Sequence, residues 1–165
     1  MEYNQVHNIT GLKSASDIKS NITDSLYPLK YLKLKDIKTA LDVGTGAGFP
    51  GLLIAIQNPN IEYTLCEPMH KKSAFLRLCK VELDIKNITI ETKRVEELNS
   101  TFDLITSRAV CNADKFLKIT SNVTAKNTSI LLYKGSNAKE ELSNIKHTIH
   151  NNKNRNYVLI KNLKC

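Results

Sequence analysis

The stretch LDVGTGAGFPGLLIAI, residues 41–56, decides the fold. In it a short apolar run is followed by glycines at every second position, Gly44, Gly46 and Gly48, and then by a longer apolar run. Glycine tolerates positive φ angles and lets a ligand approach the backbone closely, and a helix that follows presents unpaired N–H groups. The stretch therefore predicts a strand, a ligand-binding loop and a helix with Pro50 in its first turn.

Strands and helices alternate through the rest of the chain. We expect strands over 39–43, 61–67, 87–92, 102–107 and 129–134, with helices after Pro50, over 70–83 and over about 112–119, a turn or short helix over 94–98, and two closing strands over 145–149 and 156–162. This order is typical of an α/β fold: a mostly parallel sheet with helices on both faces, and a final strand that is antiparallel. In the helix over 70–83 we expect an apolar face of Ala74, Phe75, Leu78, Cys79 and Leu83.

The length of 165 residues fits one globular unit, with a short helical lead-in over 1–34 and the main domain over 35–165. No apolar run is long enough for a membrane span and no secretion signal is visible, so we expect a cytoplasmic protein, as a monomer. The four cysteines are widely spaced, which predicts neither a metal site nor disulfides. The net charge of +8 favours an anionic partner such as nucleic acid, although an AT-rich genome would also enrich lysine.

The spacing of the glycines indicates the kind of cofactor. A dinucleotide fingerprint reads G-x-G-x-x-G, whereas this loop reads G-x-G-x-G, and the bulky Phe49 and Pro50 stand where a pyrophosphate would need room. Asp42 before the loop and Glu67 at the end of the second strand complete a pattern that resembles the class I S-adenosylmethionine methyltransferases. In that reading Glu67 accepts hydrogen bonds from the ribose hydroxyls. Asp42 either fixes the loop or meets the ammonium group of the cofactor.

A closer resemblance rests on five segments, which are DVGTGAGFPG, TLCEPMHKKSAFL, KRVEEL, FDLITSRAV and LLYKGS. In this order they resemble the RsmG family, also called GidB, of bacterial 16S rRNA guanine-N7 methyltransferases, over about residues 4–161. The resemblance implies a Rossmann-like class I methyltransferase fold, S-adenosylmethionine as cofactor, and as partner 16S rRNA, in the small ribosomal subunit or its precursor. Asn21 stands where this family commonly has histidine.

Carried over by position, the resemblance implies cofactor contacts from Gly44 and Phe49, from Val95 and Glu96 after the third strand, and from Arg108 after the fourth. The other glycines of the loop, with Asp42 and Glu67, complete the expected cofactor site. An apolar side chain with a backbone amide near Val95 would suit the adenine of the cofactor.

Guanine N7 carries a free lone pair and no proton, so the expected chemistry is alignment without a general base. Arg108 is the expected positioning residue, toward the cofactor carboxylate or the RNA backbone, and Lys134 is expected to meet a phosphate or shape the substrate mouth. Arg94 and Arg155 are weaker candidates for RNA contacts, with ordinary exposed charge a slightly better explanation. No catalytic role is expected for the histidines, which are His7, His70, His147 and His150.

Three alternatives remain at this point. The first is a methyltransferase that acts on another substrate. The second is a relative that binds RNA but has weakened catalysis. The third is a nicotinamide-dependent oxidoreductase on the same kind of sheet, against which the loop spacing argues.

Overall fold

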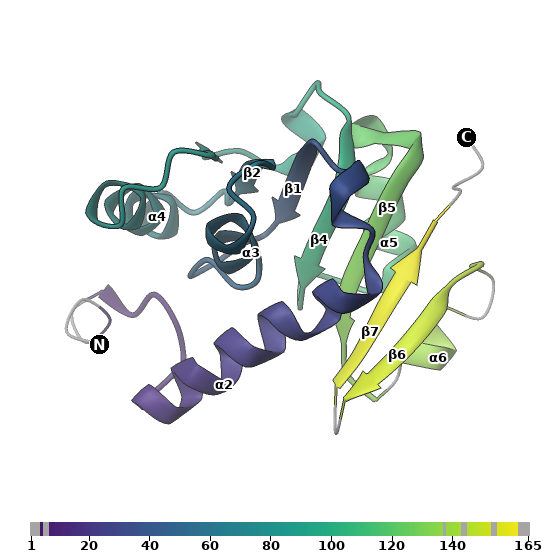
Figure 1. Ribbon diagram of the computed structural model, residues 1–165, viewed down its shortest axis with the longest axis horizontal. Helices are drawn as coiled ribbons and strands as arrows, with labels where there is room; N and C mark the ends of the chain where they lie inside the picture. The colour runs from purple at the N-terminus through teal and green to yellow at the C-terminus, as the bar shows by residue number, and fades with distance from the viewer. Residues whose placement is uncertain (1–3, 5–6, 137, 143–144, 153–154, 162–165) are drawn as a thin grey trace.

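The computed structural model describes residue 4 and residues 7–136, 138–142, 145–152 and 155–161 (Figure 1). In this part of the chain seven strands form one sheet, in the order β3-β2-β1-β4-β5-β7-β6. The strands are β1 (Thr39–Val43), β2 (Glu62–Cys66), β3 (Ile88–Glu91), β4 (Phe102–Arg108), β5 (Thr124–Lys134), β6 (Thr148–Asn152) and β7 (Arg155–Ile160).

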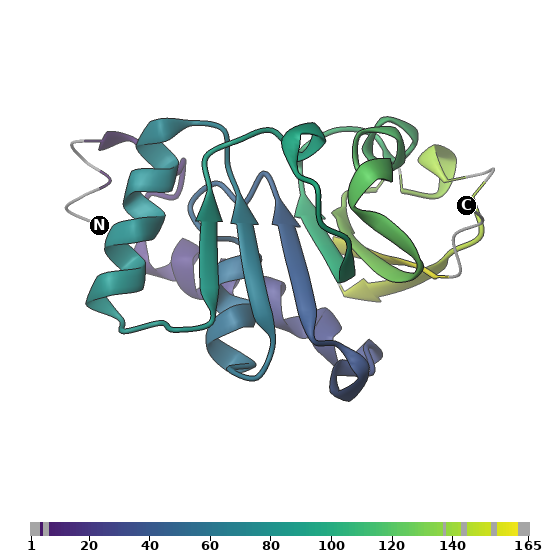
Figure 2. The ribbon, with the colours of Figure 1, turned by 90° about the horizontal axis from the view of Figure 1, so that it is seen from above.

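The sheet is parallel from β3 through β5, and Figure 2 shows the arrows of β1, β2 and β3 running the same way. β7 pairs antiparallel with both β5 and β6, so that β6 again runs with the parallel strands. The predicted fold class, with its final antiparallel strand, is confirmed. The carboxyl ends of β1 to β6 therefore lie at one edge of the sheet, where α/β proteins bind their ligands.

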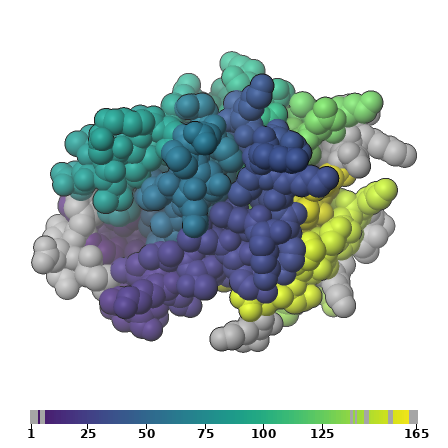
Figure 3. Space-filling model, in the orientation of Figure 1, coloured from purple at the N-terminus to yellow at the C-terminus, as the bar shows by residue number. Residues whose placement is uncertain are grey.

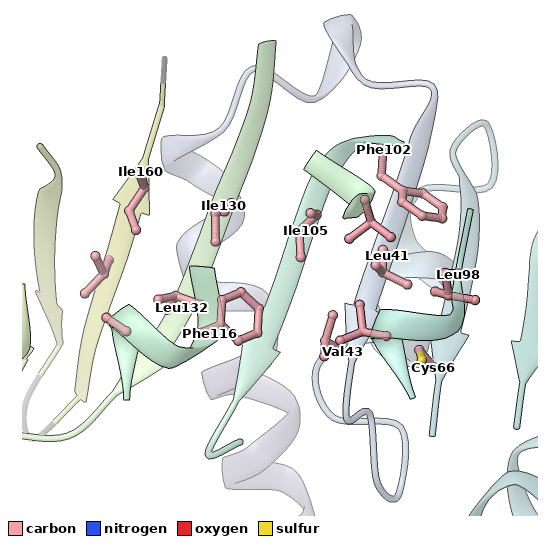
Figure 4. Close-up of a cluster of buried hydrophobic side chains, with 14 of the residues drawn as sticks. Leu41, Val43, Cys66, Leu98, Phe102, Ile105, Phe116, Ile130, Leu132 and Ile160 are labelled. Carbon is pink, nitrogen blue, oxygen red and sulfur yellow. The ribbon is translucent and has the colours of Figure 1, made fainter. Parts of the chain in front are cut away.

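Helices cover both faces of the sheet. They are α2 (Ala15–Leu26), α3 (Gly51–Gln57), α4 (His70–Glu82), α5 (Ala113–Ile119) and α6 (Ala138–Glu141), with 3₁₀ turns η1 (Tyr27–Tyr31), η2 (Leu34–Asp36), η3 (Val95–Glu97) and η4 (Ser121–Val123). α3, α4 and the lead-in pack on one face, over a core that includes Leu65 and Leu104. α5, α6 and η3 pack on the other, around Phe116 and Ile105 (Figure 4).

The lead-in forms a defined helix. α2 begins at a capping box: Ser14 Oγ accepts a hydrogen bond from the Asp17 N–H, and Asp17 Oδ2 accepts one from the Ser14 N–H. Such a cap stabilises a helix by about 1 kcal/mol. Beyond α2, Tyr27 stacks on Tyr157 of β7 with ring centres 5.3 Å apart. Figure 3 shows these segments lying against β6 and β7, so the lead-in touches the end of the sheet that the chain completes last.

Several details differ from the sequence prediction, and the first is the buried face of α4. In α4 the buried side chains are Ser73 and Leu76, whereas Leu78 and Leu83 are 41% and 60% exposed. The predicted apolar face was therefore wrong at Leu78 and Leu83, and also at Ala74, which is exposed. A buried serine is tolerated because the Ser73 hydroxyl donates to the Met69 carbonyl one turn earlier.

The closing strands also differ in their bounds. β6 begins at Thr148, three residues later than the start of the predicted strand over 145–149, and it runs on to Asn152. Pro50 is the N-cap residue of α3, just before its first turn, and the Phe49–Pro50 peptide bond is cis.

Candidate functional site

The glycine loop takes the conformation that its residues predict. Gly44, Gly46 and Gly48 have φ angles of +67°, +60° and +92°, a backbone conformation that residues other than glycine rarely adopt. The loop is tied to β2, because the Gly44 N–H donates to the Cys66 carbonyl at 2.8 Å. A Cβ on Gly44 would lie 2.6 Å from Val110 Cγ2, which is too close, so only glycine fits here without displacing the Val110 side chain.

Two carboxylates hold this loop from behind. Asp42 is fully buried; its Oδ2 accepts from the Gly51 N–H at 2.9 Å and its Oδ1 from the Thr106 hydroxyl at 2.7 Å. Burial raises the pKa of Asp42 to about 6 against these hydrogen bonds, which lower it. Of the two roles expected for Asp42, its position favours fixing the loop, since a fully buried carboxylate is not presented to a ligand.

Glu67 is also buried, at 4% exposed, and it connects the glycine loop to the segment before α4. Its Oε2 accepts from the Gly46 N–H and its Oε1 from the Met69 N–H, each at 3.0 Å. The carboxylate thus joins the glycine loop to the start of α4. The neighbours of Glu67 in the chain, Cys66 and Pro68, line a hollow at this edge.

That hollow, called here the loop-side hollow, has a volume of about 250 Å³. Its walls come from the segments after four parallel strands: Gly44 after β1, Pro68 after β2, Val95 and Glu96 after β3, and Val110 after β4. Val95 is buried, so it presents an apolar wall, whereas Glu96 is exposed at the rim. An apolar slot with a few polar groups is suited to a flat aromatic ring such as adenine.

The wall at Val95 is fixed by a side chain from a distant segment. Asn122 Nδ2 donates to the carbonyls of Val95 at 3.2 Å and Leu98 at 2.7 Å, which holds η3 in place. In the same lining, Cys66 donates its thiol hydrogen to the Lys93 carbonyl, and burial raises the pKa of Cys66 to about 12. Cys66 is therefore an uncharged core thiol, as its position in a buried strand predicts.

Arg108 lies at the carboxyl end of β4, where the sequence places it, and it is bound to the lead-in. Its Nη1 donates to Asn21 Oδ1 at 2.6 Å and to Asp24 Oδ2 at 3.3 Å, and the guanidinium carbon lies 5.3 Å from the centre of the Phe49 ring. Arg108 and Asp24 are each 17% exposed, so this ion pair is largely screened from solvent. Asp24 Oδ1 also accepts from Arg155 Nε at 3.2 Å and from the Tyr157 hydroxyl at 2.8 Å.

Lys134 is placed differently from the expectation of an open phosphate contact. Its Nζ donates to the Cys111 carbonyl at 2.8 Å and pairs with Glu141 Oε2 at 2.7 Å, and its side chain is 12% exposed. The ammonium group therefore joins the segment after β4 to α6. In this arrangement Lys134 supports the loop that carries Val110 and Cys111.

The structure thus groups the predicted residues into three sets. Gly44, Val95 and Glu96 line the loop-side hollow, Asp42 and Glu67 brace the loop together with Gly46, and Phe49 lies under Arg108. Gly48 turns the loop into α3, where its N–H donates to the Thr45 carbonyl.

Sequence reasoning missed several partners, which are Asn21, Asp24, Asn122, Arg155 in its pairing role, and Tyr157. A partly buried arginine needs an acidic partner, and an arginine at the end of a central strand is a usable signal for one. Spacing could not say which of the 16 acidic residues it would be.

None of the helices in the described part of the chain has the length and apolar character of a membrane span. The same residues include no group of three histidine, cysteine or acidic side chains placed to hold a metal ion.

Comparison with known sequences finds a family and close relatives. A family model described as rRNA small subunit methyltransferase G matches residues 1–163. The ribosomal RNA small subunit methyltransferase G of Wolinella succinogenes is 42% identical over 160 residues, covering 96% of this chain and 82% of the relative. The protein of the same name from Aliarcobacter butzleri is 42% identical over 166 residues, covering 98% and 84%. That of Campylobacter fetus subsp. fetus is 38% identical over 167 residues, covering 99% and 90%.

Solved structures share the fold at low sequence identity. A putative S-adenosyl-L-methionine-dependent methyltransferase from Methanococcus maripaludis superposes with a TM-score of 0.71 at 10% identity, over 99% of this chain and 93% of the other. A putative caffeoyl-CoA O-methyltransferase from Staphylococcus aureus gives 0.65 at 13% identity, over 97% and 89%. At these identities the likeness concerns the fold alone.

Proposed function

This chain belongs to the rRNA small subunit methyltransferase G family, and from that premise we propose that it transfers the methyl group of S-adenosylmethionine to N7 of a guanine in 16S ribosomal RNA. The observation that carries the proposal is the loop-side hollow, formed by a glycine loop at the end of β1 next to an acid at the end of β2. We take the small ribosomal subunit or its precursor as the partner. Family membership leaves the nicotinamide alternative without support.

The residues around the loop-side hollow fit the cofactor. Gly44 and Val110 line this hollow, and a Cβ at Gly44 would overlap the Val110 side chain, so this wall is formed by bare backbone. We propose that Val95 packs against the adenine and that the remaining lone pairs of Glu67 accept the ribose hydroxyls. Glu96 at the rim and Phe49 beside Arg108 complete the cofactor contacts that we expect.

The reaction asks the protein for alignment. When bound, S-adenosylmethionine supplies a methyl carbon on a positively charged sulfur, which leaves with the electron pair of the broken bond. Guanine N7 has no proton to lose, so none of the chain's residues has to act as a base. Holding two reactants in line can lower a barrier by about 7–11 kcal/mol in favourable cases.

We propose that Arg108 provides that alignment from its fixed place between Asn21, Asp24 and Phe49. Its position is set by the lead-in, so the lead-in over 1–34 and the domain over 35–165 would work as one unit. Lys134 supports this alignment indirectly. It donates a hydrogen bond to the carbonyl of Cys111 and so holds the segment that follows Arg108.

The experiment that tests the proposal is transfer of labelled methyl from S-adenosylmethionine to unmodified small-subunit rRNA, both naked and in particles. Borohydride and aniline treatment then cleaves the RNA at 7-methylguanosine. We expect label in the RNA and a single cleavage site. RNA from a strain that already carries the modification is the control and should take up no label.

The negative results have distinct meanings. Cofactor binding without label in either substrate would contradict the RNA assignment while leaving the cofactor site standing. Label without aniline cleavage would contradict methylation at N7. Cleavage at several guanines would contradict a single target.

A further inference from the structure

A second hollow, called here the helix-side hollow, lies at the same edge of the sheet, and none of its lining residues belongs to the five sequence segments that carry the family resemblance. It has a volume of about 510 Å³ and lies between α2 and the ends of β6 and β7. Ser20, Asn21, Thr23 and Asp24 of α2 line one side, and Asn152, Arg155 and Tyr157 line the other. Figure 1 shows α2 running along this edge toward β6 and β7.

Arg108 is a near neighbour of both hollows. Its guanidinium group contacts Asn21 and Asp24, which line the helix-side hollow. Two residues further along the chain, Val110 lines the loop-side hollow. A transfer reaction needs donor and acceptor in contact, so a donor and an acceptor that each extend from their hollow toward Arg108 could react beside this arginine.

The way in which RNA presents N7 favours a hollow for a single nucleotide. In an A-form helix the major groove, where N7 lies, is deep and narrow, and enzymes that modify a base commonly act on one that has left the stack. An extruded nucleotide needs a pocket of a few hundred Å³ to receive it. The volume of the helix-side hollow meets this need.

The chemistry of the lining agrees with a nucleotide. Two guanidinium groups, of Arg108 and Arg155, face one carboxylate, Asp24, which leaves a net positive charge for one phosphodiester. Arg155 uses its Nε on Asp24, and in the described residues its two terminal nitrogens have no hydrogen-bond partner. The hydroxyl of Ser20 and the amide of Asn152 offer both donors and acceptors, as the edge of guanine requires.

We propose that the helix-side hollow binds the target guanosine of the RNA, with its phosphate against Arg155 and its base turned toward Arg108. This assignment rests on the proposed function and adds the place of the acceptor. The loop-side hollow, which is smaller and has an apolar wall at Val95, would then hold the cofactor alone.

The test fills the helix-side hollow from an exposed helix position. Ser20→Trp places an indole at its wall, and Ser16→Trp, one turn earlier on the same helix and outside the lining, is the matched control. We expect Ser20→Trp to lower kcat/KM for RNA by about tenfold or more, with an unchanged Kd for S-adenosylmethionine, whereas Ser16→Trp stays within about twofold of the unaltered protein. The chain has no other tryptophan, so the emission of each variant reports whether the indole is shielded.

Two results would overturn the assignment: full RNA activity in Ser20→Trp with a shielded indole, or equal losses in both variants. If the unaltered protein methylates no RNA at all, the proposed function fails, and the hollow is then judged by nucleotide binding alone. Guanosine 5′-monophosphate at millimolar concentration should shift the NMR signals of Asn152 and Arg155 in the unaltered protein and in Ser16→Trp, but not in Ser20→Trp. No shift in the unaltered protein would overturn the assignment whatever the activity.

Discussion

The two hollows on either side of Arg108 are built by different means. The loop-side hollow depends on the main chain: the loop beside it is tied down by the N–H groups of Gly44, Gly46 and Gly51. The helix-side hollow depends on side chains from distant parts of the sequence, joined through Asp24.

This difference predicts how each hollow responds to change. A hollow made of backbone is sensitive to any added atom, because strands and loops cannot step aside. A hollow made of ion pairs and amides is sensitive to loss of a charge, because a half-buried partner is then left alone. The following predictions test that contrast, in order of decreasing effect.

The largest effect is expected from Gly51→Ala. The added Cβ would lie 2.4 Å from Asp42 Cβ, in a fully buried site where neither atom can move away. Overpacking of this kind costs about 3 kcal/mol. Urea denaturation should show this loss, with Gly135→Ala as control, since a Cβ there would meet nothing within 4 Å. Equal stability of the two variants would break the description of a backbone-built hollow.

Next in size is Arg108→Ala, which removes the residue that lies next to both hollows. We expect kcat for methyl transfer to fall roughly 100-fold, because misalignment by about 1 Å can have this effect. Arg108→Lys should recover little, since one ammonium group cannot reach Asn21, Asp24 and the Phe49 ring as the planar group does. His150→Ala is the control, within about twofold of the unaltered protein. A folded, cofactor-bound His150→Ala protein without activity would contradict alignment without a base.

A pH dependence is expected from Asp42. An ordinary aspartate, as in the unfolded chain, has a pKa of 3.8, whereas the pKa of Asp42 in the folded protein is about 6. At pH values between these two, the folded state therefore binds more protons than the unfolded state. The free energy of unfolding contributed by this group therefore falls as pH rises through about 4 to 6, by about 3 kcal/mol, and is level above that. Denaturation midpoints of Asp42→Asn, compared with those of the unaltered protein, should lack this fall. A parallel pair of curves would contradict it.

The smallest effect is expected from Glu67→Gln. One oxygen still accepts, but the new amide group opposes the N–H of either Gly46 or Met69. We expect the Kd for S-adenosylmethionine to rise about tenfold, which is about 1.4 kcal/mol. Calorimetry measures it, with Glu62→Gln at the exposed start of β2 as control. An unchanged Kd in Glu67→Gln would remove Glu67 from the cofactor site.

The same contrast explains what could be read from the sequence. A hollow built from backbone can be recognised from a short stretch of sequence, because the glycine spacing and an acid at a strand end determine the loop conformation. For this reason β1, the loop and β2 could be predicted from residues 39–67 alone. The ion pair of Arg108 with Asp24 leaves no such mark, since 84 positions separate them in the chain.

Burial on α4 shows a further limit. Leu78 and Leu83 are apolar but lie on the outer side of the helix, and Ser73 is polar but lies inside with its hydroxyl satisfied by the helix itself. The spacing of apolar residues predicts which face of a helix is buried from residue types alone. The face that is buried depends on how the helix is rotated against the sheet, which the spacing does not give. Lys134 shows the same limit, because its partner Glu141 lies in α6, a helix that the sequence pattern did not predict.

The contacts of Asp24 also bear on the order in which the molecule can be assembled during synthesis. α2 leaves the ribosome early, but Arg155 and Tyr157, which hold Asp24, follow 131 and 133 positions later. Contacts between such distant positions form late, because a long loop must close first. The helix-side hollow is therefore completed only when translation of β7 has ended, so the nucleotide site that we propose cannot form on a nascent chain before β7 has been made.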